Sequence, residues 1–81
     1  MGKGKAHAAE YGVLVRTLCD LRIEAGITQE ELAKELGRPQ SYISKIERGE
    51  RLIDPVELRR LCIALEVDMG NFVQRWVAKL P

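Results

Sequence analysis

The 81 residues of this chain suffice for one small domain. Hydrophobic residues make up 46% of the sequence but aromatic residues only 5%, so the core must be built from Leu, Ile, Val and Ala, as in a compact helical bundle. The net charge of +1 argues against a generic, strongly basic nucleic-acid coat. No apolar run approaches the roughly 18 residues that span a bilayer, and no apolar signal-peptide core is present, so we expect a cytoplasmic protein without membrane contact.

The two cysteines, Cys19 and Cys62, stand far apart, and His7 is the only histidine. A zinc site needs about four ligands, which this chain does not assemble, so we expect no metal. Two reduced thiols packed as small hydrophobes are the favoured interpretation, with a Cys19–Cys62 disulfide as the minor alternative.

The N-terminal residues 1–7, MGKGKAH, are predicted to form a flexible tail outside a single domain over residues 8–81. A short basic arm that touches nucleic-acid phosphates is the alternative for this tail. A first helix is predicted over residues 8–25, with an apolar stripe that includes Tyr11, Leu14 and Leu18, and Gly26 ends it. Arg22 projects within that stripe, so its guanidinium must snorkel to solvent or pair with a carboxylate.

Two short helices with a tight turn between them are predicted over residues 29–36 and 40–48. Thr28 is a good N-cap, and Glu31 completes a capping box. Gly37 suits a left-handed C-cap, Pro39 fits the first turn of the second helix, and Gly49 closes that helix.

The second of these helices has two unlike faces. Ile43 and Ile46 point to the core, whereas the opposite face carries Gln40, Ser41, Ser44, Lys45 and Arg48. Amide, hydroxyl and ammonium groups on one helix face are able to read base edges in a major groove. An ordinary surface helix also has a polar outer face, so this pattern alone does not decide the function.

Two further helices are predicted over residues 55–65 and 69–79. Asp54 and Glu57 form a second capping box around Pro55. The apolar residues of the last helix either close the domain's own core or form a self-complementary dimer contact. The core is expected for Phe72 and Val73, and both alternatives stay open for a last group, Trp76, Val77 and Leu80.

The segments TQxxLA, LG and QSYISKIERG, residues 28–33, 36–37 and 40–49, resemble the helix-turn-helix of the Cro and lambda-repressor-like family, often called the Xre family. The resemblance covers most of the chain. It implies an all-α fold, a compact five-helix lambda-repressor-like DNA-binding domain with a central helix-turn-helix. Arg38 departs from the apolar residue that many such turns carry, and Pro39 biases it toward an extended, outward-pointing conformation.

The function that the resemblance implies is sequence-specific binding of double-stranded DNA by a transcriptional regulator, with a repressor favoured. The expected base readers on helix 40–48 are Gln40, Ser41, Ser44 and Lys45. Gln40 suits adenine and Lys45 suits guanine. The expected phosphate contacts are Gln29, Arg38, Tyr42, Arg48 and Arg51, and Tyr42 is equally well placed as an aromatic at the edge of the core.

The resemblance also implies an ion pair between Arg22 and Glu47 that ties the first helix to the reading helix. Related small repressors often dimerise through the last helix, so a homodimer on a pseudo-palindromic site is expected, with reading helices about 34 Å apart. The alternative function is a protein-interaction module, or an antitoxin-like protein, that uses the C-terminal helix. No nucleophile–base pair, cofactor motif or small-molecule pocket is evident, so we expect no enzyme and no cofactor.

Overall fold

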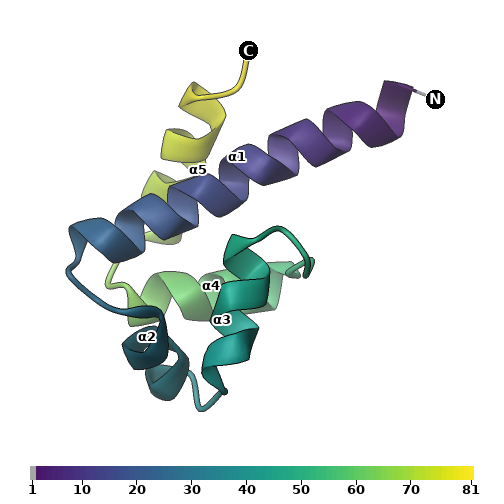
Figure 1. Ribbon diagram of the computed structural model, residues 1–81. Helices are drawn as coiled ribbons and strands as arrows, with labels where there is room; N and C mark the ends of the chain where they lie inside the picture. Colours follow the sequence, from purple (N-terminus) through teal and green to yellow (C-terminus); the bar gives the residue numbers. More distant parts are fainter. Residues whose placement is uncertain (1) are drawn as a thin grey trace.

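The computed structural model describes residues 2–81, with side chains from His7 onward, and the described part contains five helices and no strand (Figure 1). They are α1 (Gly2–Glu24), α2 (Gln29–Glu35), α3 (Gln40–Glu47), α4 (Pro55–Ala64) and α5 (Met69–Ala78). The four helices after α1 begin at the predicted residues, and each ends one residue earlier than predicted. Side-chain caps at Thr28, Asp54 and Asp68 set the starts of α2, α4 and α5, whereas α3 begins after Pro39 without a side-chain cap.

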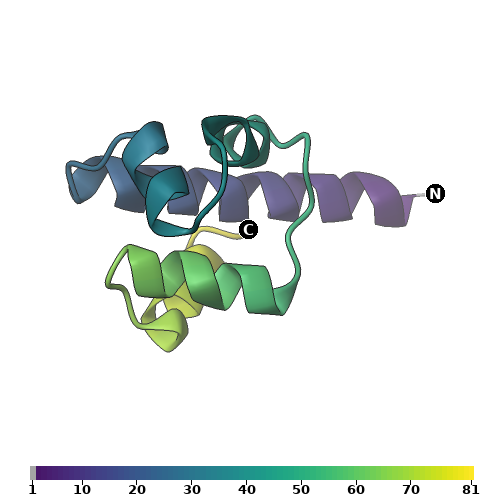
Figure 2. The same cartoon turned by 90° about the horizontal axis from the view of Figure 1, so that it is seen from below.

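The start of α1 differs from the prediction. The helix begins at Gly2, so residues 2–7, predicted to be a flexible tail, continue it, while Met1 lies outside the described residues. Alanine and lysine are good helix formers, and extending an existing helix avoids the cost of nucleation. The N-terminal end of α1 consequently projects beyond the other helices (Figures 1 and 2).

The core is one cluster of aliphatic side chains closed by a single phenylalanine. Phe72 of α5 is fully buried among residues of all five helices. The other buried members of the cluster are Leu14, Leu18, Leu32, Ala33, Ile43, Ile46, Leu58, Leu61, Cys62 and Leu65. The prediction for Val73 was wrong, because its side chain is 36% exposed beside the fully buried Phe72. At the start of α4 the pattern also overstated burial, since Val56 is 59% exposed.

The turn between α2 and α3 depends on a glycine. Gly37 has φ +67, and the following N–H of Arg38 donates to the carbonyl of Ala33 at 2.9 Å, which ends α2 in a Schellman motif. The chain then turns at Pro39 into α3. Figure 2 views α3 end-on while α1 and α4 run across the picture, so α3 is set steeply to both.

None of the described helices combines the length and apolar character needed to cross a bilayer. Both cysteines are free thiols, with Cys62 buried and Cys19 half-buried. In the described part of the chain no three His, Cys, Asp or Glu side chains are grouped to hold a metal ion.

Candidate nucleic-acid interface

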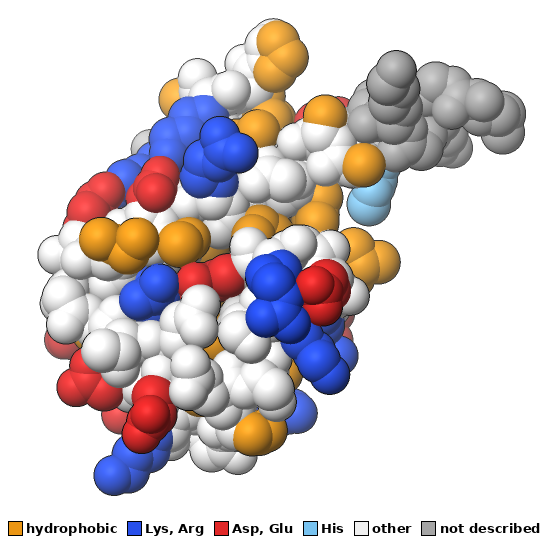
Figure 3. All heavy atoms as spheres, viewed as in Figure 1, with side chains coloured by type: hydrophobic (Ala, Val, Ile, Leu, Met, Phe, Trp, Pro, Cys, Tyr) orange, Lys and Arg blue, Asp and Glu red, His pale blue; other side chains and the backbone are white. Residues whose placement is uncertain are grey.

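The outer face of α3 carries the residues predicted to read bases. Ile43 and Ile46 are 1% and 2% exposed and anchor the inner face. Gln40, Ser41 and Lys45 are exposed and Ser44 is half-buried, its hydroxyl donating to the carbonyl of Ser41 at 3.3 Å. The surface over α2 and α3 in Figure 3 is accordingly mostly uncharged and polar, with scattered charges. The four predicted base readers therefore share one side of α3 that is open to solvent on this chain.

A nearly buried ion pair fixes the opposite end of α3 to α1. Arg22 Nε lies 2.6 Å from Glu47 Oε2, and the two side chains are 12% and 10% exposed. A second guanidinium nitrogen, Nη2, donates to Glu47 Oε1 at 3.1 Å, and Nη1 donates to the carbonyl of Ile27 at 2.7 Å. The guanidinium predicted to need a carboxylate thus has the expected partner, and it also satisfies a backbone carbonyl between α1 and α2.

Glu47 extends this pair toward the outer face of α3. Its Oε1 accepts a hydrogen bond from Gln29 Nε2 at 2.8 Å, and Gln29 Oε1 lies 3.4 Å from Gln40 Nε2. Side-chain contacts therefore connect Arg22 of α1 to Glu47 of α3, Glu47 to Gln29 of α2, and Gln29 to Gln40, the first residue of α3. Gln29, predicted as a phosphate contact, uses its side-chain amide within the protein and lies next to Gln40.

The same cluster shifts the pKa values of two acids. Burial raises the pKa of Glu47, but hydrogen bonds from Arg22 and Gln29 outweigh burial and hold the pKa below its usual value. Burial raises the pKa of Cys19, and the carboxylate of Glu47, 3.5 Å from the sulfur, raises it further. Glu47 is therefore ionised and Cys19 is a protonated thiol at neutral pH.

Tyr42 lies between two arginines at the edge of the core. The guanidinium carbons of Arg38 and Arg51 lie 4.8 Å and 4.9 Å from the centre of its ring. Its hydroxyl donates to Glu57 Oε2 at 2.8 Å. Burial raises the pKa of Tyr42, with the carboxylate of Glu57 adding to the effect. Of the two alternatives for this residue, this geometry favours the core-edge aromatic, because its hydroxyl proton is already committed.

Glu57 has a second structural role beyond the predicted capping box. One oxygen accepts from the backbone N–H of Asp54 at 3.1 Å, as the capping box predicts. The other accepts from Tyr42 and from Arg51 Nη2, the latter at 2.6 Å. The Asp54 N–H first, and then Tyr42 and Arg51, lower the pKa of Glu57 to about 2. The connection after α3 is further held by Tyr11, whose hydroxyl donates to the carbonyl of Arg51 at 2.6 Å.

The basic residues around α3 fall into two groups. Arg48 and Arg51 are paired within the chain, Arg48 with Glu50 at 2.8 Å and Arg51 with Glu57. Both members of the Arg48–Glu50 pair are 55% exposed, so this pair contributes little to stability. Lys45 and Arg38 form no ion pair with any side chain that the structure describes. Among the basic residues around α3, Lys45 and Arg38 are therefore the most available to an anionic partner.

Part of the apolar stripe of α5 packs against the rest of the domain. Trp76 packs against the core, and its indole N–H donates to the carbonyl of Glu10 on α1 at 3.0 Å. Arg75 of α5 forms an ion pair with Glu24, which is also on α1. Val77 is 52% exposed and Leu80 is half-buried, and both border a hollow beside α1. The open apolar surface at the C-terminal end of the chain thus consists of Val77, on α5, and Leu80, just after it, rather than Trp76.

The order of α2, a glycine turn and α3, with a polar outer face on α3, is the geometry of a helix-turn-helix. The sequence pattern of the helix-turn-helix family matches residues 20–72, which include both helices and α4. The chain belongs to this family. The resemblance to Xre-type proteins drawn from the residues is thereby confirmed, and so is the five-helix fold.

Individual members of the family match over most of the chain. An XRE-family like protein from Pseudomonas syringae pv. tomato str. DC3000 is 39% identical, with both chains covered completely and a TM-score of 0.89. The restriction-modification controller protein C.Esp1396I, solved as a tetramer in complex with its natural 35 base-pair operator, is 29% identical over 85% of this chain and 91% of its own, with a TM-score of 0.79.

Among curated sequences, the chain is similar to the ImmF control region 10 kDa protein of Bacillus phage phi105. The two are 34% identical over 61 residues, which cover 75% of this chain. The match spans 64% of the length of the phage protein.

Proposed function

We propose that this protein binds double-stranded DNA in a sequence-specific manner and regulates transcription, as a repressor. The observation that carries the proposal is the polar row on α3, which the buried Arg22–Glu47 pair and Gln29 hold outward from the core. The buried Ile43 and Ile46 anchor α3, so the row of amide, hydroxyl and ammonium groups on its outer face suits base edges. The proposed role is a cytoplasmic one and requires no catalytic group.

In this mechanism α3 enters the major groove. Gln40, oriented by Gln29, forms two hydrogen bonds to one adenine, and Lys45, about one turn later, donates to guanine acceptors. Ser41 and Ser44 serve neighbouring bases or phosphates. Arg38 and Arg48 contact the phosphate backbone on either side of α3, and the first N–H groups of α2 add a neutral donor site for a phosphate.

We further propose that the DNA-bound form is a homodimer on a pseudo-palindromic site. The oligomeric controller bound to its operator supports this assembly for a chain of the same fold. The exposed Val77 and half-buried Leu80, next to α1, offer an apolar surface that a two-fold axis could pair with its copy. Two copies of α3 would then lie about one turn of DNA, roughly 34 Å, apart.

The test is selection of bound duplexes from a random pool, followed by sequencing, with the wild type and Gln40→Ala at low and physiological salt. The expected result is a two-fold-symmetric motif from which the variant loses one base preference, at a cost of about 1–3 kcal/mol per half-site. Gln74→Ala, which removes an exposed glutamine from α5, is the matched control and should keep the motif.

Binding without an enriched motif, or binding that disappears at physiological salt, would refute sequence-specific recognition. That outcome would favour the rival function, a protein-interaction module that uses α5. The outer face of α3 argues against this rival. An interaction module that does not read DNA is expected to carry apolar or acidic residues on this face, whereas α3 carries polar and basic ones.

A further inference from the structure

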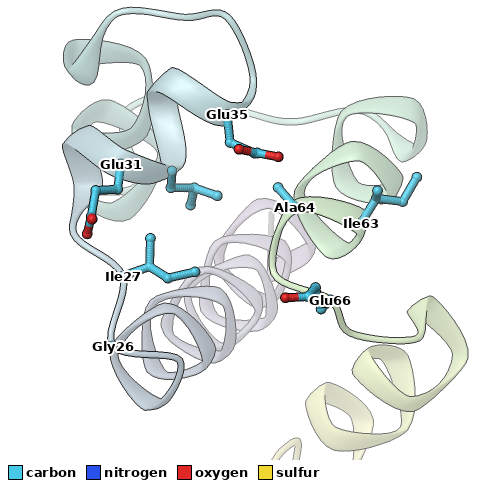
Figure 4. A pocket seen from close by; sticks show the side chains of 8 residues that line it. Gly26, Ile27, Glu31, Glu35, Ile63, Ala64 and Glu66 are labelled. Atoms are coloured by element: carbon cyan, nitrogen blue, oxygen red, sulfur yellow. The ribbon is translucent and has the colours of Figure 1, made fainter.

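A groove lies between α2 and α4, on a part of the surface to which α3 contributes no lining residue. Its volume is about 510 Å³, and Ile27, Leu32, Ile63 and Ala64 supply its apolar lining (Figure 4). A second hollow of about 360 Å³ continues it past Ile63 and Ala64, which border both. Ile63 is 58% exposed, so a large aliphatic side chain of α4 faces solvent at this groove.

The rim of this groove is acidic. Glu31 and Glu35 come from α2, and Glu66 follows α4. Figure 4 shows the Glu35 and Glu66 side chains pointing from opposite walls into the space between α2 and α4. None of the three carboxylates is paired with a cation among the side chains that the structure describes. Of the residues that line the two hollows, only Arg60, at the far end of the second, is positively charged.

Glu66 occupies a backbone position that normally belongs to glycine. Its φ is +56, and the N–H of Val67 donates to the carbonyl of Cys62, so Glu66 ends α4 as Gly37 ends α2. A residue with a Cβ is strained in this left-handed conformation. The carboxylate at the rim of the groove is therefore present despite a backbone cost that a glycine would avoid.

We propose that this groove binds a basic, amphipathic segment of a partner protein. Apolar side chains of that segment lie against Ile27 and Ile63, and lysines or arginines beside them pair with Glu35 and Glu66. Helix-in-groove recognition uses this combination of an apolar seat and charged edges. Desolvation of carboxylates that have no counter-charge would be unfavourable beneath an uncharged partner, so the charge selects a cationic one.

The carboxylates at the rim also disfavour binding of other classes of macromolecule in the groove. Nucleic acid and anionic membrane surfaces are repelled by three carboxylates around an apolar floor. No residue of α3 lines the groove, so binding of the partner is measurable in the absence of DNA. The inference consequently does not depend on the proposed DNA binding and fails or holds separately from it.

The experiment is a selection of random 12-residue peptides, displayed on phage, against the full chain. The expected consensus has apolar residues at helical spacing with adjacent Lys or Arg. A synthetic peptide of that consensus should bind at least tenfold more weakly to Ile63→Ala and to Glu35→Lys, measured by fluorescence polarisation. Glu10→Lys, the same charge change at an exposed residue of α1, is the matched control and should bind as the wild type does.

Glu66→Gly separates loss of a contact from loss of the fold. It removes the carboxylate and relieves the left-handed backbone, so it should weaken peptide binding while the melting temperature stays constant or rises. Failure to enrich a basic apolar consensus, or equal affinity of the groove variants and the wild type, overturns the proposal. Self-association in sedimentation velocity that Ile63→Ala abolishes also overturns it, since a second copy would then occupy the groove.

Discussion

Arg22 binds Glu47 side-on, with Nε 2.6 Å from Oε2 and Nη2 3.1 Å from Oε1. The third nitrogen of the same guanidinium, Nη1, holds the carbonyl of Ile27. One arginine therefore joins α1, the segment before α2 and the end of α3. Three segments that must keep a fixed mutual orientation meet at a single, nearly dry ion pair.

Glu47→Gln should destabilise the fold by about 3 kcal/mol, because it leaves the Arg22 guanidinium desolvated without a counter-charge. For a domain of this size the melting temperature should fall by more than about 10 °C. Thermal unfolding followed by circular dichroism measures the change. Glu50→Gln, which breaks the exposed pair with Arg48, should cost less than about 1 kcal/mol. Equal losses in the two variants would contradict a special role for the buried pair.

Stability should decline in acid, and Glu47 and Glu57 contribute to the decline. The pKa of Glu47 is lowered and that of Glu57 lies at about 2, whereas in the unfolded chain both titrate near the usual 4.5. The unfolded state therefore takes up protons first as the pH falls, so the stabilisation is complete above about pH 4.5 and is lost toward pH 2. Urea unfolding between pH 2.5 and 6 should show this slope, and Glu57→Gln should make it shallower. An unchanged slope in that variant would contradict the low pKa.

The sequence was sufficient where local chemistry sets the structure. Thr28 with Glu31 and Asp54 with Glu57 form the two predicted capping boxes, and α2 and α4 begin where these boxes place them. The family resemblance supplied the Arg22–Glu47 pair, whose members are 25 residues apart and have no local signature. The capping residues and the family resemblance together thus predicted the five-helix fold and the polar outer face of α3.

The contacts that depend on packing between helices were not predictable from one sequence. Glu57 has the local signature of a cap only, and its second oxygen reaches Tyr42 because α4 packs behind α3. Val73 follows the apolar spacing of α5, yet its neighbour Phe72 is the residue that is fully buried in the core. Helical periodicity identifies a face but cannot show how much of that face a neighbouring helix will cover.

Gln29 should act on DNA through Gln40. If it orients the Gln40 amide, Gln29→Ala should weaken the base preference of Gln40, and it should have little further effect on that preference in the Gln40→Ala background. A double-mutant cycle on the selected duplex should give a coupling energy of about 0.5–1.5 kcal/mol. Additive losses would instead indicate that Gln29 contacts a phosphate independently.

Arg38 should contribute to affinity without contributing to specificity. It has no carboxylate partner among the described side chains and lies over the Tyr42 ring at the start of α3. Arg38→Ala should reduce the slope of log K against log salt by about 0.9 per protomer and leave the selected motif unchanged. Arg59→Ala, at an exposed arginine of α4, is the control and should leave the slope unaltered. A changed motif would show that Arg38 reads a base.

Tyr42→Phe distinguishes the two roles of this tyrosine. The hydroxyl donates to Glu57, so its removal should cost about 1 kcal/mol of stability and raise the pKa of Glu57, which loses one of its donors. The ring between Arg38 and Arg51 remains, so affinity for the selected duplex should change less than twofold. The pKa is measured by NMR titration of the Glu57 carboxyl group, and the affinity by fluorescence anisotropy. A large loss of affinity with an unchanged Glu57 pKa would mean that the hydroxyl leaves the carboxylate and binds a phosphate in the complex.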